Sequence, residues 1–102
     1  MKTMSFERLI AAACLRWLNS LPGARFRRQR GDESNAGEPD VYGTAPAFGG
    51  RLLLIEFKRP GMKSRPLQVA VQRKWARAGA LVLADVTSLE DLKARLASFF
   101  SS

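Results

Sequence analysis

Two charged residues stand at the end of the most apolar stretch of the chain. Glu56 and Lys58 follow the run Leu52–Ile55, which is typical of a buried strand. Side chains alternate across a strand, so residues two apart project from the same face. The spacing therefore predicts a carboxylate and an ammonium group held side by side on a rigid element. A simple ion pair at the surface end of a strand would produce the same pattern.

A third charged residue, Asp40, comes from the preceding predicted strand, directly after a proline. If residues 40–44 and 51–58 pair as a hairpin, Asp40 lies near Glu56, because both stand near the same end. Two adjacent carboxylates repel each other and raise a pKa unless a cation neutralises them. Mg²⁺ takes hard oxygen ligands and keeps several waters, and water bound to it beside Lys58 is a candidate nucleophile. The alternative is that Asp40 is only a turn residue.

Two glutamines lie four residues apart on the segment 66–78, which is predicted to be a helix. Gln68 and Gln72 therefore share one helix face. Amide groups beside a metal-carboxylate cluster can orient water or a phosphate oxygen. Solvated surface amides are the alternative, which is preferred for Gln72 and stays open for Gln68.

The elements that must position these residues form one α/β domain over 1–102. A capping box of Thr87 and Glu90 is expected to open the last helix. The predicted core is a small mixed sheet flanked by helices, built from a helix at 5–19, an edge strand at 24–30, a strand within 39–44, a hairpin loop at 45–50, a strand at 51–58, a helix at 66–78, a strand at 80–86 and a final helix.

The composition narrows the chemistry. The 102 residues include 17 Lys and Arg against 9 Asp and Glu, a net charge of +8, which favours a polyanionic partner and nucleic acid first. The chain has no histidine, which removes Ser-His and Cys-His catalysis and histidine-based zinc sites. The single cysteine, Cys14, lies on the apolar side of the first helix and is expected in the core. No membrane span or secretory signal is evident, so a cytoplasmic location is expected.

Four segments in order resemble the virus-type replication-repair nuclease (VRR-NUC) domain, a branch of the PD-(D/E)xK nuclease superfamily. The family pattern has a helix-borne Glu, a Gly-x-Pro-Asp, a hydrophobic strand ending in Glu-x-Lys, and a Gln at the next helix with a Gly eleven residues later. Gln68 and Gly79 fit this last spacing, which favours Gln68 over Gln72. The matching segments are GEPD (37–40), LLLIEFK (52–58), PLQ (66–68) and RAGALVLADV (77–86), and the resemblance covers about residues 7 to 96.

This resemblance implies a minimal PD-(D/E)xK core and a role for each matching residue. Asp40 and Glu56 would bind the divalent metal, magnesium with manganese as a substitute, helped by the backbone carbonyl of Phe57. Lys58 would position or activate the attacking water and stabilise developing charge. Gln68 would orient the residues of the active site.

The helix-borne acidic residue of the family pattern corresponds to Glu7. It lies at the edge of the apolar stripe of the first helix, and by resemblance it would complete the metal site. Glu33 and Glu38 compete for this role, but both sit in a polar loop, where a solvated charge is the preferred interpretation.

The basic residues could bracket a scissile phosphate with backbone contacts, which position nucleic acid without reading its sequence. A solvated basic face is the preferred interpretation for Arg73, Lys74 and Arg77. The residues expected to bind nucleic acid are Arg25, Arg27, Arg28 and Arg30 before the site, and Arg59, Lys63 and Arg65 after it.

The expected function is magnesium-dependent hydrolysis of DNA phosphodiester bonds by an endonuclease. Stand-alone members of the resembling family are small homodimers associated with branched DNA such as Holliday junctions, and the resemblance also suggests a phage or mobile-element origin. One alternative is a basic nucleic-acid-binding module without catalysis, which would need no acidic pair beside Lys58. Another is a nuclease subunit that acts only with a partner.

Overall fold

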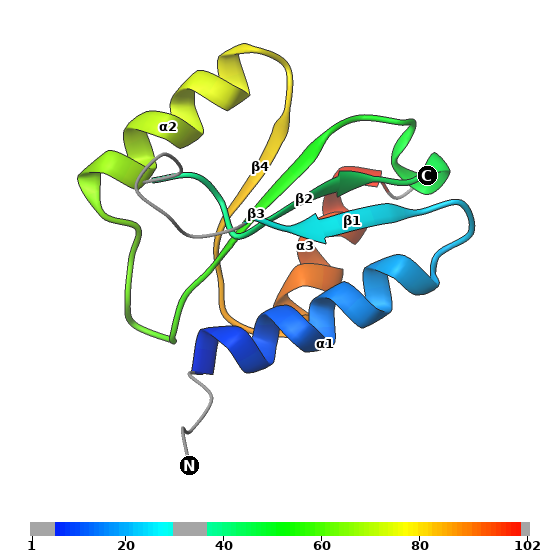
Figure 1. The fold of residues 1–102 in the computed structure, drawn as a ribbon, viewed down its shortest axis with the longest axis horizontal. Helices are drawn as coiled ribbons and strands as arrows, with labels where there is room; N and C mark the ends of the chain where they lie inside the picture. The colour runs from blue at the N-terminus through cyan, green and yellow to red at the C-terminus, as the bar shows by residue number, and fades with distance from the viewer. Residues whose placement is uncertain (1–5, 30–36, 101–102) are drawn as a thin grey trace.

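The computed structural model describes residues 6–29 and 37–100. These residues form four strands and three α-helices in the predicted order, and the segment predicted to be a hairpin loop contains a short 3-10 helix, η2 (Figure 1). The elements are α1 (Phe6–Ser20), β1 (Arg25–Arg28), β2 (Val41–Thr44), η2 (Pro46–Phe48), β3 (Leu53–Phe57), α2 (Pro66–Arg77), β4 (Leu81–Val86) and α3 (Leu89–Phe100).

The four strands form one mixed sheet in the order β1-β2-β3-β4. β2 pairs antiparallel with both β1 and β3, whereas β3 and β4 run parallel. Parallel neighbours need a crossover connection, and α2 lies in that connection. The fold class predicted from the sequence, a small mixed sheet flanked by helices, is therefore confirmed.

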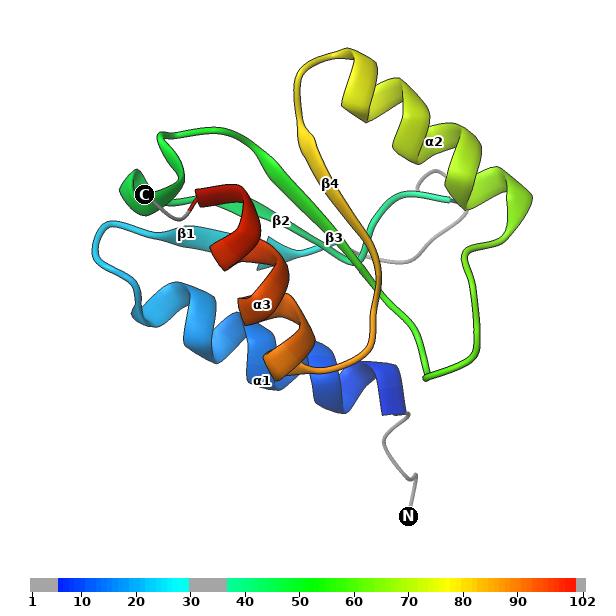
Figure 2. The same ribbon diagram turned by 180° about the vertical axis from the view of Figure 1, so that it is seen from behind.

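The helices cover the two faces of the sheet unequally. α1 and α3 lie together on one face, and α2 lies on the other side next to β4, away from β1 and β2 (Figures 1 and 2). The core packs between the sheet and the α1–α3 layer, and it includes Leu53, Ile55 and Phe57. Leu54 and Glu56 are also buried, and by strand alternation they face the α2 side. Strand β3 is thus buried on both faces, as its apolar run predicts.

The turn after β2 is more ordered than the predicted glycine loop. Its 3-10 helix begins at a proline, which suits the first turn of a helix. Gly49 and Gly50 then adopt positive φ angles of 65° and 74°, a conformation that glycine adopts without steric cost. The chain reverses there and enters β3.

The last helix begins one residue later than the predicted capping box requires. Ser88 Oγ accepts a hydrogen bond from the backbone N–H of Asp91 at 2.9 Å, and Asp91 Oδ2 accepts one from the backbone N–H of Thr87 at 3.1 Å. The predicted pair of Thr87 and Glu90 was therefore wrong by one position. Ser and Asp satisfy the free N–H groups at a helix start as well as Thr and Glu do, so composition alone could not choose. None of the described helices is long and apolar enough to cross a membrane.

Candidate active site

Asp40 and Glu56 meet at the end of the β2–β3 hairpin, as the sequence predicts. The pairs Val41–Ile55 and Tyr42–Leu54 extend to place Asp40 opposite Glu56. Asp40 Oδ2 accepts a hydrogen bond of 2.9 Å from the backbone N–H of Phe57. The Asp40 carbonyl accepts another, of 2.7 Å, from the backbone N–H of Gln29. The Asp40 side chain therefore continues the strand pairing and is held against the end of β3.

The Glu56 carboxyl is almost completely enclosed, with 1% of the residue exposed. Its Oε1 accepts a hydrogen bond from Gln68 Nε2, but its Oε2 is buried without a hydrogen-bond partner among the described residues. The pKa of Glu56 is raised from 4.5 to about 9, mainly by burial and then by the neighbouring Asp40 carboxyl. The charge of Lys58 lowers this pKa, but by less.

These two carboxyl groups fit a hard divalent cation. A buried carboxylate oxygen without a partner is costly, and an adjacent second carboxylate adds repulsion that a cation would remove. Among residues 6–29 and 37–100, no group of three or more acidic, histidine or cysteine side chains could hold a metal ion. A metal at Asp40 and Glu56 would therefore complete its coordination with backbone carbonyls, water or substrate oxygens, as Mg²⁺ commonly does.

Gln68 connects this pair to the start of α2. While its Nε2 donates to Glu56, its Oε1 accepts a hydrogen bond of 2.7 Å from the backbone N–H of Arg65, the residue that caps α2. The amide thus caps the helix and orients the Glu56 carboxyl at the same time. A glutamine at the third position of a helix suits such a cap, so the capping role of Gln68 can be recognised from the sequence.

Gln72 also faces inward, contrary to the expectation of a solvated amide. It is 9% exposed, and its Nε2 donates to Ser64 Oγ at 3.0 Å. The reason is that α2 turns the shared face of Gln68 and Gln72 toward the sheet. Gln72 holds the loop before α2, whereas Gln68 contacts the carboxyl pair.

A bulge in β4 supports the same loop, and no sequence signal predicts it. The β3–β4 register shifts between Ile55 and Phe57, and nearby Asp85 has a φ of 57°. Asp85 Oδ1 accepts hydrogen bonds from the backbone N–H of Ser64 at 2.8 Å and from its Oγ at 2.7 Å. The guanidinium of Arg95 donates to the backbone carbonyls of Ala84 and Asp85. The basic loop between β3 and α2 is therefore tied to β4 and α3.

Lys58 is the first residue after β3 and is half-buried. Its backbone N–H donates to the Val86 carbonyl at 3.0 Å, so β4 holds the residue in line with the strand. Its ammonium group forms no ion pair with the described residues, and its charge reaches Glu56 strongly enough to lower the pKa of that carboxyl. Lys58 is thus a cation held near the acidic pair and left available for a ligand.

Comparison with known proteins identifies this architecture. The sequence matches no family model and no curated protein. A solved structure described as a "VRR_NUC domain" has a TM-score of 0.79 at 19% identity, covering 95% of this chain and 100% of that one. A second, described as a "VRR_NUC domain protein", has a TM-score of 0.70 at 14% identity, covering 96% of this chain and 90% of that one. The chain has the VRR-NUC fold. At these identities the likeness concerns the fold, and it confirms the fold that the motifs predicted.

Glu7 lies in the first turn of α1 of this VRR-NUC fold, but it does not join the acidic pair. Its Oε1 is 3.8 Å from Arg59 Nε, in a pair of partly exposed side chains, and such pairs contribute little to stability. With no group of three acidic residues in the described chain, its role at a metal stays a prediction. Glu33 lies outside the described residues. Glu38 is half-buried and accepts a hydrogen bond of 2.8 Å from Trp75 Nε1, so it is not the solvated charge that was expected.

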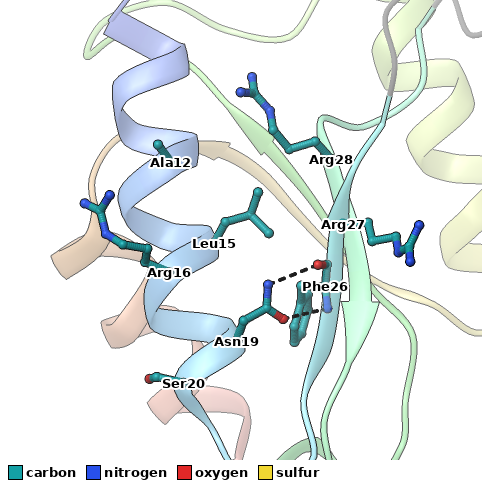
Figure 3. Close-up of a pocket in the computed structure, with 8 residues that line it drawn as sticks. All are labelled: Ala12, Leu15, Arg16, Asn19, Ser20, Phe26, Arg27 and Arg28. Atoms are coloured by element: carbon teal, nitrogen blue, oxygen red, sulfur yellow. Dashed lines mark hydrogen bonds between the residues drawn. The ribbon is translucent and has the colours of Figure 1, made fainter.

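The predicted nucleic-acid-binding residues divide between two faces. Arg25, Arg27 and Arg28 are all exposed on β1, but alternation along a strand separates neighbours. Figure 3 shows Arg28 on the side of α1 and Arg27 on the opposite side of β1. Arg59, Lys63 and Arg65 are exposed in the loop that leads from β3 to α2, and Arg30 lies outside the described residues.

A large hollow between α1 and β1 lies apart from the acidic pair. It has a volume of about 830 Å³ and no acidic lining residue. Asn19 crosses it and bonds the backbone of Phe26 twice, accepting from the N–H at 2.9 Å and donating to the carbonyl at 3.1 Å (Figure 3). These bonds occupy part of the free edge of β1, which limits pairing with another strand. The hollow is lined by Ala12, Leu15, Arg16, Asn19, Ser20, Phe26, Arg27 and Arg28.

Cys14 is buried in the core, as the sequence predicts. Burial raises the pKa of its thiol from 9.0 to about 11, with further contributions from the charges of Glu90 and Asp91. Because the thiolate is the reactive form, Cys14 is unsuited to act as a nucleophile at neutral pH.

Proposed function

We propose that this chain is a nuclease that hydrolyses DNA phosphodiester bonds with a divalent metal ion, magnesium first. The observation that carries the proposal is a buried Glu56 oxygen that has no hydrogen-bond partner among the described residues. It lies next to a second carboxylate at the end of β3 in a VRR-NUC fold. A buried carboxyl with a raised pKa, next to a second carboxyl and a cation, is typical of a functional site. The basic surface supports a nucleic-acid substrate.

The metal would be held by the carboxylates of Asp40 and Glu56, with the backbone carbonyl of Phe57 as a further oxygen ligand. Such an ion would polarise the phosphate and lower the pKa of bound water. Manganese is expected to substitute, because carboxylate, carbonyl and water ligands suit both ions.

The protein's own groups have separate tasks in this proposal. Lys58 stabilises the negative charge that develops on the phosphate, because a fixed cation in a partly enclosed site acts strongly there. Gln68 keeps the Glu56 carboxyl in one orientation through its amide. Arg59, Lys63 and Arg65 would contact neighbouring phosphates and hold the strand in place.

We further propose a homodimer that acts on branched DNA. A two-fold dimer would present two active sites to two strands. The apolar residues that could form its interface lie together. Trp17 and Phe100 line the same hollow of about 550 Å³, and the ring of Phe99, which is 57% exposed, lies 6.5 Å from the Phe100 ring between centroids. Light scattering on a size-exclusion column would give the mass, and Phe99→Asp would be expected to convert a dimer to monomers.

The experiment that tests the nuclease compares labelled four-way junction, flap, linear duplex and single-stranded DNA, each with magnesium, manganese or chelator. Wild-type protein is expected to cut in either metal and not in chelator. Lys58→Ala is expected to reduce cutting by about a hundredfold or more, the scale of a lost electrostatic group. Lys74→Ala, which removes an exposed lysine from α2, is the matched control and should cut normally.

The substrate ranking from this experiment would test the preference for branched DNA. If all substrates are bound but none is cut with either metal, the stand-alone nuclease is wrong. The alternatives would then be the basic binding module and the subunit that needs a partner. A binding module should also keep its DNA affinity in chelator.

A further inference from the structure

Half of one sheet face is left uncovered by the helices. α1 and α3 cover the opposite face, and α2 lies beside β4, so none of the described helices lies over the α2-side face of β1 and β2 (Figures 1 and 2). Two large side chains lie open there: Tyr42 is 38% exposed and Leu52 is 37% exposed. Exposed apolar and aromatic groups gathered on one face often mark a binding surface.

Two arginines stand beside this aromatic residue. Arg27 pairs with Tyr42 across the strands, and Arg25 pairs with Thr44, so all four side chains share one face. Figure 3 shows Arg27 directed away from α1 and onto that face. Neither arginine forms an ion pair with the described residues. Together with Leu52 they line a hollow of about 390 Å³. The charge of this hollow is positive, and no acidic side chain of the described residues lines it.

A second hollow adjoins the first on the other side of the tyrosine. It has a volume of about 260 Å³, and Tyr42 and Leu52 line both hollows. Trp75 and Glu38 also line it, with the indole N–H bonded to the Glu38 carboxylate at 2.8 Å. Tyr42 thus stands between a basic hollow and one walled by a fixed aromatic ring.

The uncovered face of β1 and β2 lies next to the carboxyl pair of Asp40 and Glu56. Tyr42 lies in β2, two residues after Asp40, which directly precedes the strand. If the alternation of the strand extends to Asp40, the two side chains project from one face, about 7 Å apart along the strand. Because Glu56 also faces this side, the tyrosine lies next to the place where the scissile phosphate would bind. A group on this face would therefore contact the nucleotide beside the cut.

We propose that this half-face is a platform for an unpaired nucleotide, with Tyr42 stacked on its base and Arg25 and Arg27 bound to its phosphates. Aromatic side chains on open sheets stack on splayed bases, and such stacking tolerates any base because each has a π-face. A base inside a continuous duplex is already stacked and does not offer that face. The platform implies that the enzyme prefers substrates with an unpaired nucleotide beside the cut, and this part of the inference rests on the proposed nuclease. Binding of the nucleotide by the platform does not require cutting.

The test measures binding in chelator, so that it does not depend on catalysis. A fluorescent single strand and the duplex of the same sequence are titrated by anisotropy. Tyr42→Ala is expected to weaken single-strand binding by about tenfold, the effect of one lost base stack, and to leave duplex binding unchanged. Tyr42→Phe keeps the ring and should bind like wild type. Leu9→Ala removes an exposed apolar side chain from α1 and should change neither affinity.

The arginines are tested through the salt dependence of the same binding. Arg27→Ala should reduce the slope of log affinity against log salt by about 0.7, the value for one phosphate contact on a single strand. Arg16→Ala is the matched control, because Arg16 is exposed on α1 and directed away from β1 (Figure 3), and it should leave the slope unchanged.

Three results would overturn the platform. In the first, wild-type protein does not bind the single strand, or Tyr42→Ala binds it normally. In the second, Tyr42→Ala weakens single-strand and duplex binding by the same factor. In the third, Tyr42→Ala converts a dimer to monomers, which would make this face a contact between copies. Single-strand binding that depends on Tyr42, without cutting in magnesium or manganese, would refute the nuclease and retain the platform.

Discussion

The carboxyl of Glu56 shows how one residue can be unfavourable for folding and useful for binding. Burial makes its ionised form costly, and the nearby Asp40 increases the cost. Lys58 offsets only part of it. An ion with two positive charges would reverse the balance, because it favours both ionised carboxylates. The cost is thus present in the free protein and removed when the proposed metal binds.

This environment predicts an unusual pH dependence for the metal-free protein. The pKa of Glu56 is raised from 4.5 to about 9 by folding, so between these values the folded state binds more protons than the unfolded state. Linkage then requires the contribution of Glu56 to stability to be fully present below pH 4.5 and to be lost as the pH rises toward about 9. Glu56→Gln keeps an acceptor for the Gln68 amide but has no ionisable group. Its stability should therefore not fall with pH in the way expected for wild type.

Urea unfolding in chelator at several pH values would measure the effect. Near the upper end of that range, Glu56→Gln is expected to be more stable than wild type by roughly 1–3 kcal/mol, the cost of one unsatisfied buried group. Glu90→Gln replaces an exposed glutamate on α3 and serves as the control. Parallel pH profiles for wild type and Glu56→Gln would contradict the raised pKa.

The same residue makes a prediction about magnesium. A ligand that binds only the folded state stabilises it by about 2.7 kcal/mol at a hundredfold excess over its Kd, and each kcal/mol raises the Tm of a domain this size by roughly 4–8 °C. At a hundredfold excess over its Kd, magnesium should therefore raise the Tm of wild type by roughly 10–20 °C. Asp40→Asn and Glu56→Gln should lose most of this shift. Thermal melts with an equal ionic strength of sodium chloride exclude a general salt effect, and an equal shift in both variants would refute the assignment of these ligands.

At the scale of elements, the loop before α2 depends on a contact far away in sequence. Asp85 accepts two hydrogen bonds from Ser64 while its own backbone has a positive φ, which costs a side-chain-bearing residue roughly 1–2 kcal/mol. Asp85→Ala should therefore lose about 1–3 kcal/mol of stability, because the half-buried N–H and hydroxyl of Ser64 lose their acceptor. Chemical denaturation would measure it.

Asp85→Asn provides the comparison for that experiment. Asparagine tolerates the left-handed conformation and keeps one carbonyl acceptor for Ser64. It should lose less stability than alanine does. If both variants are as stable as wild type, the bulge does not hold the loop.

The elements themselves were largely predictable, because each carries its own local pattern. The apolar run of β3 and the helical spacing of α1 and α3 are patterns within a short stretch of sequence. The proximity of Asp40 and Glu56 follows from the pairing of one hairpin. The exceptions depend on partners that are distant in sequence. The inward turn of Gln72, the Glu38–Trp75 bond and the bulge at Asp85 arise only when β4 and α2 pack. The sequence "LADV" is compatible with a regular strand, so nothing local indicates the bulge.

At the scale of the whole molecule, the net charge of +8 should dominate the affinity for DNA. Arg59, Lys63 and Arg65 stand exposed on the loop that leads from the acidic pair to α2, where a bound duplex would release counterions. Each phosphate contact contributes about 0.9 to the slope of log affinity against log salt. Replacing all three residues with alanine should therefore lower that slope by roughly 2–3.

The matched control replaces Arg73, Lys74 and Arg77, three exposed cations on α2, and removes the same charge from the molecule. The two triple variants have the same net charge. If only the loop residues contact phosphates, the two variants will differ in the slope of log affinity against log salt. Equal slopes in both would show that long-range charge, and not this loop, governs binding. Titrations in chelator over a range of salt concentrations would measure both slopes, and they would separate local contacts from the general field of a basic protein.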